Sequence, residues 1–276
     1  MKHVLSIQDL SCVGRCSLTV TAPVLSAMGC RCSVLPTAIL STHTGFPNPE
    51  VISLTDRLAT LDAHWQSQGI RFDAVLTGYL ADPQQAEAVL PLIQRYKAQG
   101  SRIIVDPAMG DHGKLYSRLD DDHVFAMSEI CKEANILLPN LTEAAFLTEI
   151  PYREETDGAY LRALTGGLLR YYGVNSAIIT GIPGQNDSLG FCGADKTEGI
   201  FTWQGPRVPR SCHGTGDLFA AVFTGALLRE KDLYASAVLA AEFVRKCVEN
   251  TPEATPHGVD FETMLPWLWE QLTADS

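Results

Sequence analysis

Residues 72–107 read FDAVLTGYLADPQQAEAVLPLIQRYKAQGSRIIVDP, and this stretch decides the fold. Its two apolar runs, at 72–80 and 102–107, predict strands, and the residues between them predict a helix over 82–98 that is closed by Gly100. Two strands joined by a helix form a βαβ unit, in which both strands lie parallel in one sheet.

The same alternation of apolar runs and helical stretches continues toward both ends of the chain. Strands are predicted at 3–8, 31–39, 135–140 and 176–181, with a hairpin or antiparallel pair at 188–194 and 199–203. Helices are predicted at 51–68, 121–133, 141–147, 157–172, 232–249 and 259–272, and one more follows the GTGD segment and ends near 229. Within 17–28 a helix is expected, where Pro23 indicates a late start or a kink and Gly29 suits the C-cap. Loops are expected at 41–50 and 110–116.

This order of elements predicts an α/β fold with a mostly parallel central sheet. The apolar character of the strand runs fits a sheet that helices cover on both faces. No linker rich in Pro, Gly or Ser and no run of charges divides the 276 residues, so we expect one domain over 1–276.

Composition excludes several classes of protein. Hydrophobic residues make up 46% and charged residues 19%, which excludes a disordered chain. The formal charge of −11 disfavours nucleic-acid binding, and the absence of an 18-residue apolar run disfavours a membrane span. The first residues, MKHVLSIQDLS, do not resemble a signal peptide, so a cytoplasmic protein with eight reduced cysteines is expected. These cysteines form no C-x-x-C pair and are interpreted as small buried side chains rather than a zinc site.

Polar residues follow most of the predicted strands. In open parallel sheets, ligands bind beyond the carboxyl ends of the strands, so a cluster of polar strand ends indicates a binding site. The segments concerned are Gln8–Asp9, Thr37–Ser41, Thr77–Tyr79, Asp106, Asn140 and Thr180.

The segment Cys212–Asp217, which reads CHGTGD, precedes an apolar helical stretch. Small residues at the start of a helix let backbone N–H groups approach an anion, and the helix dipole favours its charge. Asp217 is either only a helix cap or a base that accepts a proton from a hydroxyl attacking phosphorus. Neither G-x-x-x-x-G-K-[ST] nor G-x-G-x-x-G occurs, so any phosphate chemistry uses another scaffold.

Five segments, taken in order, resemble the ribokinase superfamily and within it the pyridoxal kinases. Ser41–Phe46 resembles the S-N-H-T-G-Y substrate loop, Thr77–Leu80 the S-G-Y-L strand end, and Asp106–Gly110 the D-P-V-M-G segment. Asn140–Glu143 resembles the N-x-x-E motif, and Gly214–Asp217 completes the set. The resemblance covers nearly the whole chain and implies a three-layer α/β/α sandwich and a dimer.

The resemblance also implies roles for individual residues. Asp217 is the base for the substrate's primary alcohol, and the anion hole consists of Gly214, Thr215 and Gly216. Asp106 and Glu143 belong to the Mg²⁺ and phosphate network, with Glu143 acting through water. The nucleotide ATP is bound by Asn140, Thr180 and Tyr116, the last at the end of a flap over residues 110–116. The substrate is bound by Asp9, His43, Thr44, Tyr79 and His213.

Four positions qualify this resemblance. Asp9 stands where many pyridoxal kinases have Ser, and an acid there favours a substrate with an amine, such as pyridoxamine. Leu138 replaces a Thr near a site for a monovalent cation, which argues against the K⁺ dependence that the family implies. Residues 213–216 also resemble the hydroxymethylpyrimidine kinases, although those typically continue with Cys where this chain has Asp217. Cys212 is interpreted as either a reactive lid thiol or a buried one.

The sequence therefore predicts an ATP-dependent kinase of pyridoxal, pyridoxamine and pyridoxine that makes the 5′-phosphate. A hydroxymethylpyrimidine (phosphate) kinase is the nearest alternative, and a sugar or nucleoside kinase is less favoured at 276 residues. A protein that carries pyridoxal phosphate without catalysis is a further alternative, against which the anion hole and Asp217 count.

Overall fold

The computed structural model describes residues 1–253 and 255–273. Its contacts divide the chain into two units, of which the first comprises Met1–Arg57 with Val208–Ser276 and the second Leu58–Arg207. The expectation of a single domain stays a prediction, and the two units are described separately.

The first unit begins with a strand, helix and strand. Strands β1 (His3–Ser11) and β2 (Arg31–Leu40) pair in parallel and are connected by α1 (Leu18–Ala27). The short strand β3 (Val51–Ser53) pairs antiparallel with β2. Because β1 is buried along nearly its whole length, its polar residues near the carboxyl end, Gln8 and Asp9, are withdrawn from water.

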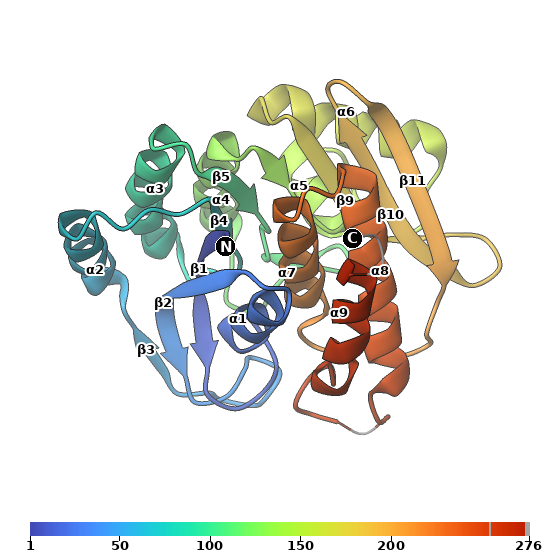
Figure 1. Ribbon diagram of the computed structural model, residues 1–276. Coiled ribbons are helices and arrows are strands. Elements are labelled where there is room, and N and C mark those ends of the chain that lie inside the picture. Colours follow the sequence, from blue (N-terminus) through green and yellow to red (C-terminus); the bar gives the residue numbers. More distant parts are fainter. Residues whose placement is uncertain (254, 274–276) are drawn as a thin grey trace. The chain divides into compact units, whose positions relative to one another are not determined.

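The remainder of the first unit is helical. It contains α7 (Thr215–Leu228), α8 (Leu233–Asn250), a 3₁₀ turn η1 (Glu262–Met264) and α9 (Leu265–Thr273). Helix α7 packs against both α1 and α8, as Figure 1 shows for the orange and red helices. Its residues from Leu218 to Ala226 are all buried, which explains why α7 is apolar on every side.

The second unit contains a run of parallel strands that ends in an antiparallel pair. Its strands are β4 (Ala74–Thr77), β5 (Arg102–Val105), β8 (Ile136–Leu137) and β9 (Ser176–Pro183), each parallel to the next, followed by the antiparallel strands β10 (Ser188–Asp195) and β11 (Gly199–Pro206). The last three lie side by side in Figure 1. A separate hairpin consists of β6 (Gly110–Asp111) and β7 (Lys114–Leu115).

Helices connect and flank these strands. They are α2 (Thr55–Ser67), which begins in the first unit, α3 (Pro83–Ala98), α4 (Asp121–Glu133), α5 (Leu141–Thr148) and α6 (Gly158–Tyr172). Helices α3 and α4 contact β5, and α5 and α6 contact β9. The predicted α/β class, with mostly parallel strands flanked by helices, is confirmed.

The structure corrects several predicted elements. A single helix over 51–68 is wrong, because Val51 and Ile52 pair with Leu40 and Ile39 of β2 and the helix begins only at Thr55. Of the two alternatives for the first helix, the late start is wrong, since α1 begins at Leu18 and contains Pro23, and the kink stays a prediction. Gly29 has a φ of 77° directly after the C-cap residue of α1, consistent with its predicted place at the helix end.

Two further elements differ from their predicted form. The loop predicted at 110–116 contains the β6–β7 hairpin, whose two turn residues, His112 and Gly113, have φ of 50° and 74° as a type I′ turn requires. The last predicted helix starts at Glu262 rather than 259, because the N–H groups of Val259 and Asp260 donate to His213 and Thr251 instead of forming a helical turn.

Candidate active site

The first unit places the CHGTGD segment at the N-terminus of α7. Gly214 is the N-cap residue, with a φ of 85°, and has no side chain that could cap the helix. A Cβ at Gly214 would lie 2.1 Å from the backbone oxygen of Arg15, so only glycine fits this position. The N–H groups of Thr215 and Gly216 therefore begin a 14-residue helix at a point where the backbone is closely held and positive in potential. This geometry suits an anion hole.

Asp217 lies in the first turn of the same helix. Its Oδ2 accepts a hydrogen bond of 2.8 Å from the backbone N–H of Ser17. Burial of the carboxyl raises its pKa to about 7; the Ser17 N–H opposes this rise, and the charge of Asp9 adds to it. A carboxyl with a pKa near neutral pH is suited to accept a proton and later to release it.

Asp9 lies near the end of β1 and is 4% exposed. Its Oδ1 accepts a hydrogen bond of 2.5 Å from the Ser17 hydroxyl, and its Oδ2 accepts one of 3.1 Å from the Ser11 hydroxyl. Burial raises the pKa of Asp9, while the two hydroxyls lower it. The predicted contact of Asp9 with a substrate amine stays a prediction, and the structure adds that both of its oxygens already have serine partners.

His43 is buried at the base of the loop that contains Thr44. The Gly45 N–H donates to its Nδ1 at 3.0 Å, which leaves the proton on Nε2, and Nε2 lies 2.8 Å from the backbone oxygen of Pro256. Burial lowers the pKa of His43, so the ring is neutral at pH 7. The rings of His43 and His213 are 4.8 Å apart, and Thr44 is exposed. His43, Thr44 and His213 thus form one cluster, whose contact with a substrate stays a prediction.

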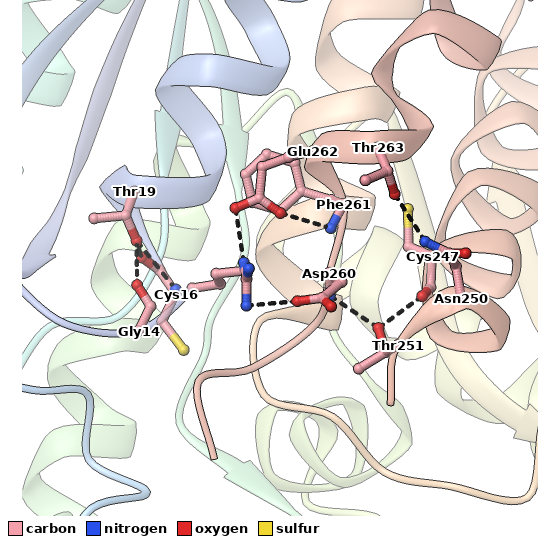
Figure 2. Close-up of polar contacts among 11 residues, drawn as sticks. Gly14, Cys16, Thr19, Cys247, Asn250, Thr251, Asp260, Phe261, Glu262 and Thr263 are labelled. Carbon is pink, nitrogen blue, oxygen red and sulfur yellow. Dashed lines mark hydrogen bonds and ion pairs between the residues drawn. The ribbon is translucent and has the colours of Figure 1, made fainter. Parts of the chain in front are cut away.

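No signal in the sequence pointed to a set of polar contacts around Arg15, whose backbone oxygen lies close to Gly214. The Arg15 side chain forms ion pairs with Asp260 at 2.6 Å and with Glu262 at 2.7 Å, and the Arg15 backbone N–H donates to the backbone carbonyl of His257. Figure 2 shows Asp260 and Glu262 together with Thr251, whose hydroxyl accepts from the Asp260 N–H and donates to Cys247. No local motif announces these contacts, because Arg15 and Glu262 are 247 residues apart in the chain.

The segment before α1 is held by its own polar contacts. The Thr19 hydroxyl donates to the carbonyls of Gly14 at 3.0 Å and Cys16 at 2.8 Å, as Figure 2 shows. Cys212, by contrast, is partly exposed, and burial raises the pKa of its thiol. This rise disfavours the thiolate that a reactive lid cysteine needs.

In the second unit, the N-x-x-E segment forms a capping box at the start of α5. The Asn140 Oδ1 accepts the Glu143 N–H at 3.0 Å, and Glu143 Oε2 accepts the Asn140 N–H at 2.9 Å. Glu143 Oε1 also accepts from Met109 at 2.9 Å and from Gly110 at 3.5 Å. Burial raises the pKa of Glu143 to about 7 against the opposing effect of these N–H groups. Glu143 is therefore a residue that holds backbone in place.

The β6–β7 hairpin, which corresponds to the predicted flap, is attached to α5 at both ends. The Asn140 Nδ2 donates to the Gly110 carbonyl at 2.7 Å, and the Gly113 N–H donates to the Thr142 hydroxyl at 2.9 Å. Tyr116 follows the hairpin and is 42% exposed. Motion of this hairpin as a lid stays a prediction.

Of the remaining predicted residues of the second unit, Asp106 and Tyr79 follow strands, whereas Thr180 lies inside one. Asp106 follows β5, is 8% exposed, and accepts the Ala108 N–H at 3.1 Å. Thr180 lies within β9 and forms a bridge with Asn140, so these two predicted nucleotide-binding residues are neighbours. Tyr79 follows β4 and is partly buried.

The carboxylates of the second unit fit Mg²⁺ only if phosphates and water complete its ligands. Among residues 1–253 and 255–273, no group of three or more His, Cys, Asp or Glu side chains is arranged to hold a metal ion. Mg²⁺ in kinases is bound by one or two carboxylates together with phosphates and water, so a group of three protein ligands is not required. Asp106 suits a carboxylate ligand of that kind, whereas Glu143, with both oxygens bound to N–H groups, suits contact only through water.

The chain is similar to known kinases. A family model described as phosphomethylpyrimidine kinase matches residues 23–260. The chain is 30% identical over 260 residues to a pyridoxine/pyridoxal/pyridoxamine kinase of Bordetella bronchiseptica, which covers 91% of this chain and 90% of that protein. It thus belongs to the phosphomethylpyrimidine kinase family and, within it, to the pyridoxal kinases of the ribokinase superfamily.

Solved structures agree with this assignment. A pyridoxal kinase from Lactobacillus plantarum superimposes with a TM-score of 0.89 at 32% identity and covers 98% of each chain. A putative phosphomethylpyrimidine kinase from Bacteroides thetaiotaomicron, in a crystal form with pyridoxal, gives a TM-score of 0.92 at 32% identity and covers 97% of this chain and 95% of that one. The predicted family and the predicted class of enzyme, a kinase, are confirmed.

Proposed function

We propose that this chain transfers the terminal phosphoryl group of ATP to the 5′-hydroxymethyl group of pyridoxal, pyridoxamine and pyridoxine. The observation that carries this function is Asp217, a carboxyl with a pKa of about 7 in the first turn of a helix whose N-cap is glycine. A carboxylate beside an anion hole is repelled by the anion unless it has a chemical role. The role that fits is acceptance of the substrate's hydroxyl proton.

The reaction then balances as follows. The 5′-oxygen of the vitamer forms a bond to the γ-phosphorus, the bond from that phosphorus to the β-phosphate oxygen breaks, and ADP leaves. The hydroxyl proton passes to Asp217, whose orientation is held by the Ser17 N–H. The N–H groups of Gly214, Thr215 and Gly216 stabilise the charge on the transferred group.

On the nucleotide side, we assign ATP binding to Asn140, Thr180 and Tyr116. Asn140 and Thr180 form a β-bridge, and the Asn140 side chain also donates to the Gly110 carbonyl. These contacts support a shared role of Asn140 and Thr180 in nucleotide binding. Mg²⁺ would be held by Asp106 with Glu143 acting through water, and when bound it supplies neutralisation of phosphate charge. Dependence on K⁺ is not part of this assignment, because Leu138 is a buried apolar side chain.

For the vitamer, we assign binding to Asp9, His43, Thr44, Tyr79 and His213. The tilted contact between the His43 and His213 rings, with centroids 4.8 Å apart, supports an aromatic contact with a pyridine ring. Since both ring nitrogens of His43 already have backbone partners, this residue would contact the substrate through its ring face.

A second candidate substrate is hydroxymethylpyrimidine or its phosphate. The matched family model carries the description phosphomethylpyrimidine kinase, and residues 213–216 resemble the corresponding segment of such enzymes. Asp217 and the Ser41–Phe46 loop favour the vitamer over the pyrimidine.

We further propose a cytoplasmic homodimer. In the described residues no helix is long and apolar enough to cross a membrane. All eight cysteines, which lie between residues 12 and 247, are free thiols, and this supports a reducing compartment. Ile52 on the edge strand β3 is 56% exposed and suits a subunit contact, which sedimentation of the purified protein would test.

The experiment for the function is an ADP-release assay with Mg·ATP and four acceptors: pyridoxal, pyridoxamine, pyridoxine and hydroxymethylpyrimidine. Turnover on the three vitamers is expected, with the product identified as the 5′-phosphate by mass spectrometry. Turnover on the pyrimidine alone would replace the vitamer as substrate, and binding of pyridoxal phosphate with no turnover on any acceptor would favour the carrier.

A further inference from the structure

Ser17 has a backbone conformation that residues with side chains rarely adopt. Its φ is 51° and its ψ is −125°, the region of the first central residue of a type II′ turn, where glycine dominates. A serine is strained there because of its Cβ. Strained residues persist where the surrounding structure holds them, and they cluster at functional sites. The presence of serine instead of glycine therefore needs a reason that involves its side chain.

The contacts of Ser17 supply that reason. Its hydroxyl donates to Asp9 Oδ1 at 2.5 Å, and its backbone N–H donates to Asp217 Oδ2 at 2.8 Å. Ser17 and Asp9 are each 4% exposed, so water does not compete for the bond between them. Glycine would retain the N–H but would lose the hydroxyl. The side chain of Ser17 is thus needed only for the bond to Asp9.

These two bonds form one chain of contacts from β1 to α7. Asp9 belongs to β1, and its Oδ1 accepts the Ser17 hydroxyl; the bond of 3.1 Å from Ser11 goes to the other oxygen, Oδ2, and is not part of this chain. The bond to Asp9 holds Ser17 in a conformation that it would otherwise leave, and this conformation aims its N–H at Asp217. Because the Ser17 N–H holds Oδ2 of Asp217, it also fixes the direction of Oδ1, and a fixed orientation favours proton transfer.

We propose that Ser17 and Asp9 are positioning residues for Asp217: the bond from the Ser17 hydroxyl to Asp9 locks the backbone that orients the base. This role rests on the proposed function of Asp217. Asp9 then acts on every vitamer through Ser17, whether or not the substrate has an amine.

The test uses Ser17→Gly and Asp9→Ala, singly and together, with Ser11→Ala as the matched control. Ser11 and Ser17 both donate to the Asp9 carboxylate, but only Ser17 also contacts Asp217. Pyridoxine is the substrate, because it carries no amine that Asp9 could bind directly. For each variant, kcat, KM for ATP and Tm are measured on the full chain.

Ser17→Gly is expected to lower kcat about tenfold or more, since a hydrogen bond to a charged group is lost, while KM for ATP stays within about twofold. Its Tm stays close to that of the wild type, because loss of strain offsets loss of the bond. Asp9→Ala removes the acceptor of the Ser17 hydroxyl and is expected to lower kcat similarly. The double variant is expected to lose no more, because both changes break the same chain of contacts. Ser11→Ala is expected to keep kcat within about twofold of the wild type.

Full kcat in Ser17→Gly would overturn the inference, as would equal losses in Ser17→Gly and Ser11→Ala that follow their losses in Tm. Additive losses in the double variant would also overturn it. In each of these cases the wild-type protein still turns over pyridoxine, so the proposed function stands. Wild-type protein without turnover on any vitamer would overturn the proposed function and this inference with it.

Discussion

Replacement of Gly214 by alanine tests whether the backbone at the start of α7 is the anion hole. The change has two separate physical costs. Gly214 has a φ of 85°, and an L-residue in the left-handed region costs about 1–2 kcal/mol. The new Cβ would also lie 2.1 Å from the Arg15 carbonyl oxygen, so the two backbones must separate by about 1 Å, and a misplacement of about 1 Å can lower a rate about 10²-fold.

Gly100→Ala is the matched control for the first cost. Gly100 has a φ of 95°, and nothing lies within 4 Å of a Cβ built there. Both variants should therefore lose stability by about 1–2 kcal/mol in urea unfolding, with a further loss for Gly214→Ala. In the ADP-release assay, Gly100→Ala should keep the wild-type kcat, whereas Gly214→Ala should lose about 10²-fold in kcat.

One result would refute this reasoning. If Gly214→Ala kept wild-type kcat while it was less stable than Gly100→Ala, the separation of the two backbones would be real but the N–H groups of Thr215 and Gly216 would not be part of catalysis. Equal stability of the two variants would instead mean that the contact with Arg15 relaxes without cost.

Three further outcomes are expected. Asp217→Asn should lower kcat by at least ~10² with KM for ATP nearly unchanged. It should also raise Tm at pH 8, because the pKa of Asp217 is about 7 in the folded state against an ordinary 3.8, so folding opposes ionisation of the carboxyl. A wild-type kcat or a lowered Tm would contradict this. In the wild type, kcat/KM should fall about tenfold per pH unit below pH 7 as Asp217 is protonated. Asp9→Asn should move this acidic limb of the pH profile to lower pH, because it removes a charge that helps to raise the pKa of Asp217. An unmoved limb would mean that Asp9 does not contribute to that pKa. Glu143→Gln should lower the free energy of unfolding in urea by about 1–3 kcal/mol, because one amide NH₂ replaces an oxygen that accepts backbone N–H groups. The control Glu129→Gln, whose partly exposed side chain pairs with Lys132 on the same helix, should change stability little.

At Asp217, a loss of folding stability accompanies the proposed function. A carboxylate withdrawn from water is costly to ionise, and burial therefore raises the pKa of Asp217, at the place where the proposed function requires a proton acceptor. Ser17 carries a second cost of the same kind, in backbone strain. Both costs occur in the first unit, at adjoining residues of one contact network.

Features that depend on neighbours in the sequence were predicted well. The helix that begins at Leu141 was predicted, and the capping box that Asn140 and Glu143 form there, which was not predicted, agrees with their spacing, because residues three apart meet at the first turn of a helix. The start of α7 after Gly214 follows from the conformational freedom of glycine and the apolar run behind it. Errors fell where partners are distant, as for β3, which is a strand only because it pairs with β2.

The sequence by itself determined the α/β class, the family, and the backbone around Gly214 and Asn140, because hydrophobic periodicity and short spacings are local properties. Tertiary structure alone decided which groups surround Asp217. Ser17 donates to it from 200 residues away, and Arg15 reaches Glu262 across 247. Such contacts depend on how strands and helices pack, and no short motif encodes them. The pKa and orientation of Asp217 are therefore set by the fold, although its role as the proposed base was inferred from the sequence.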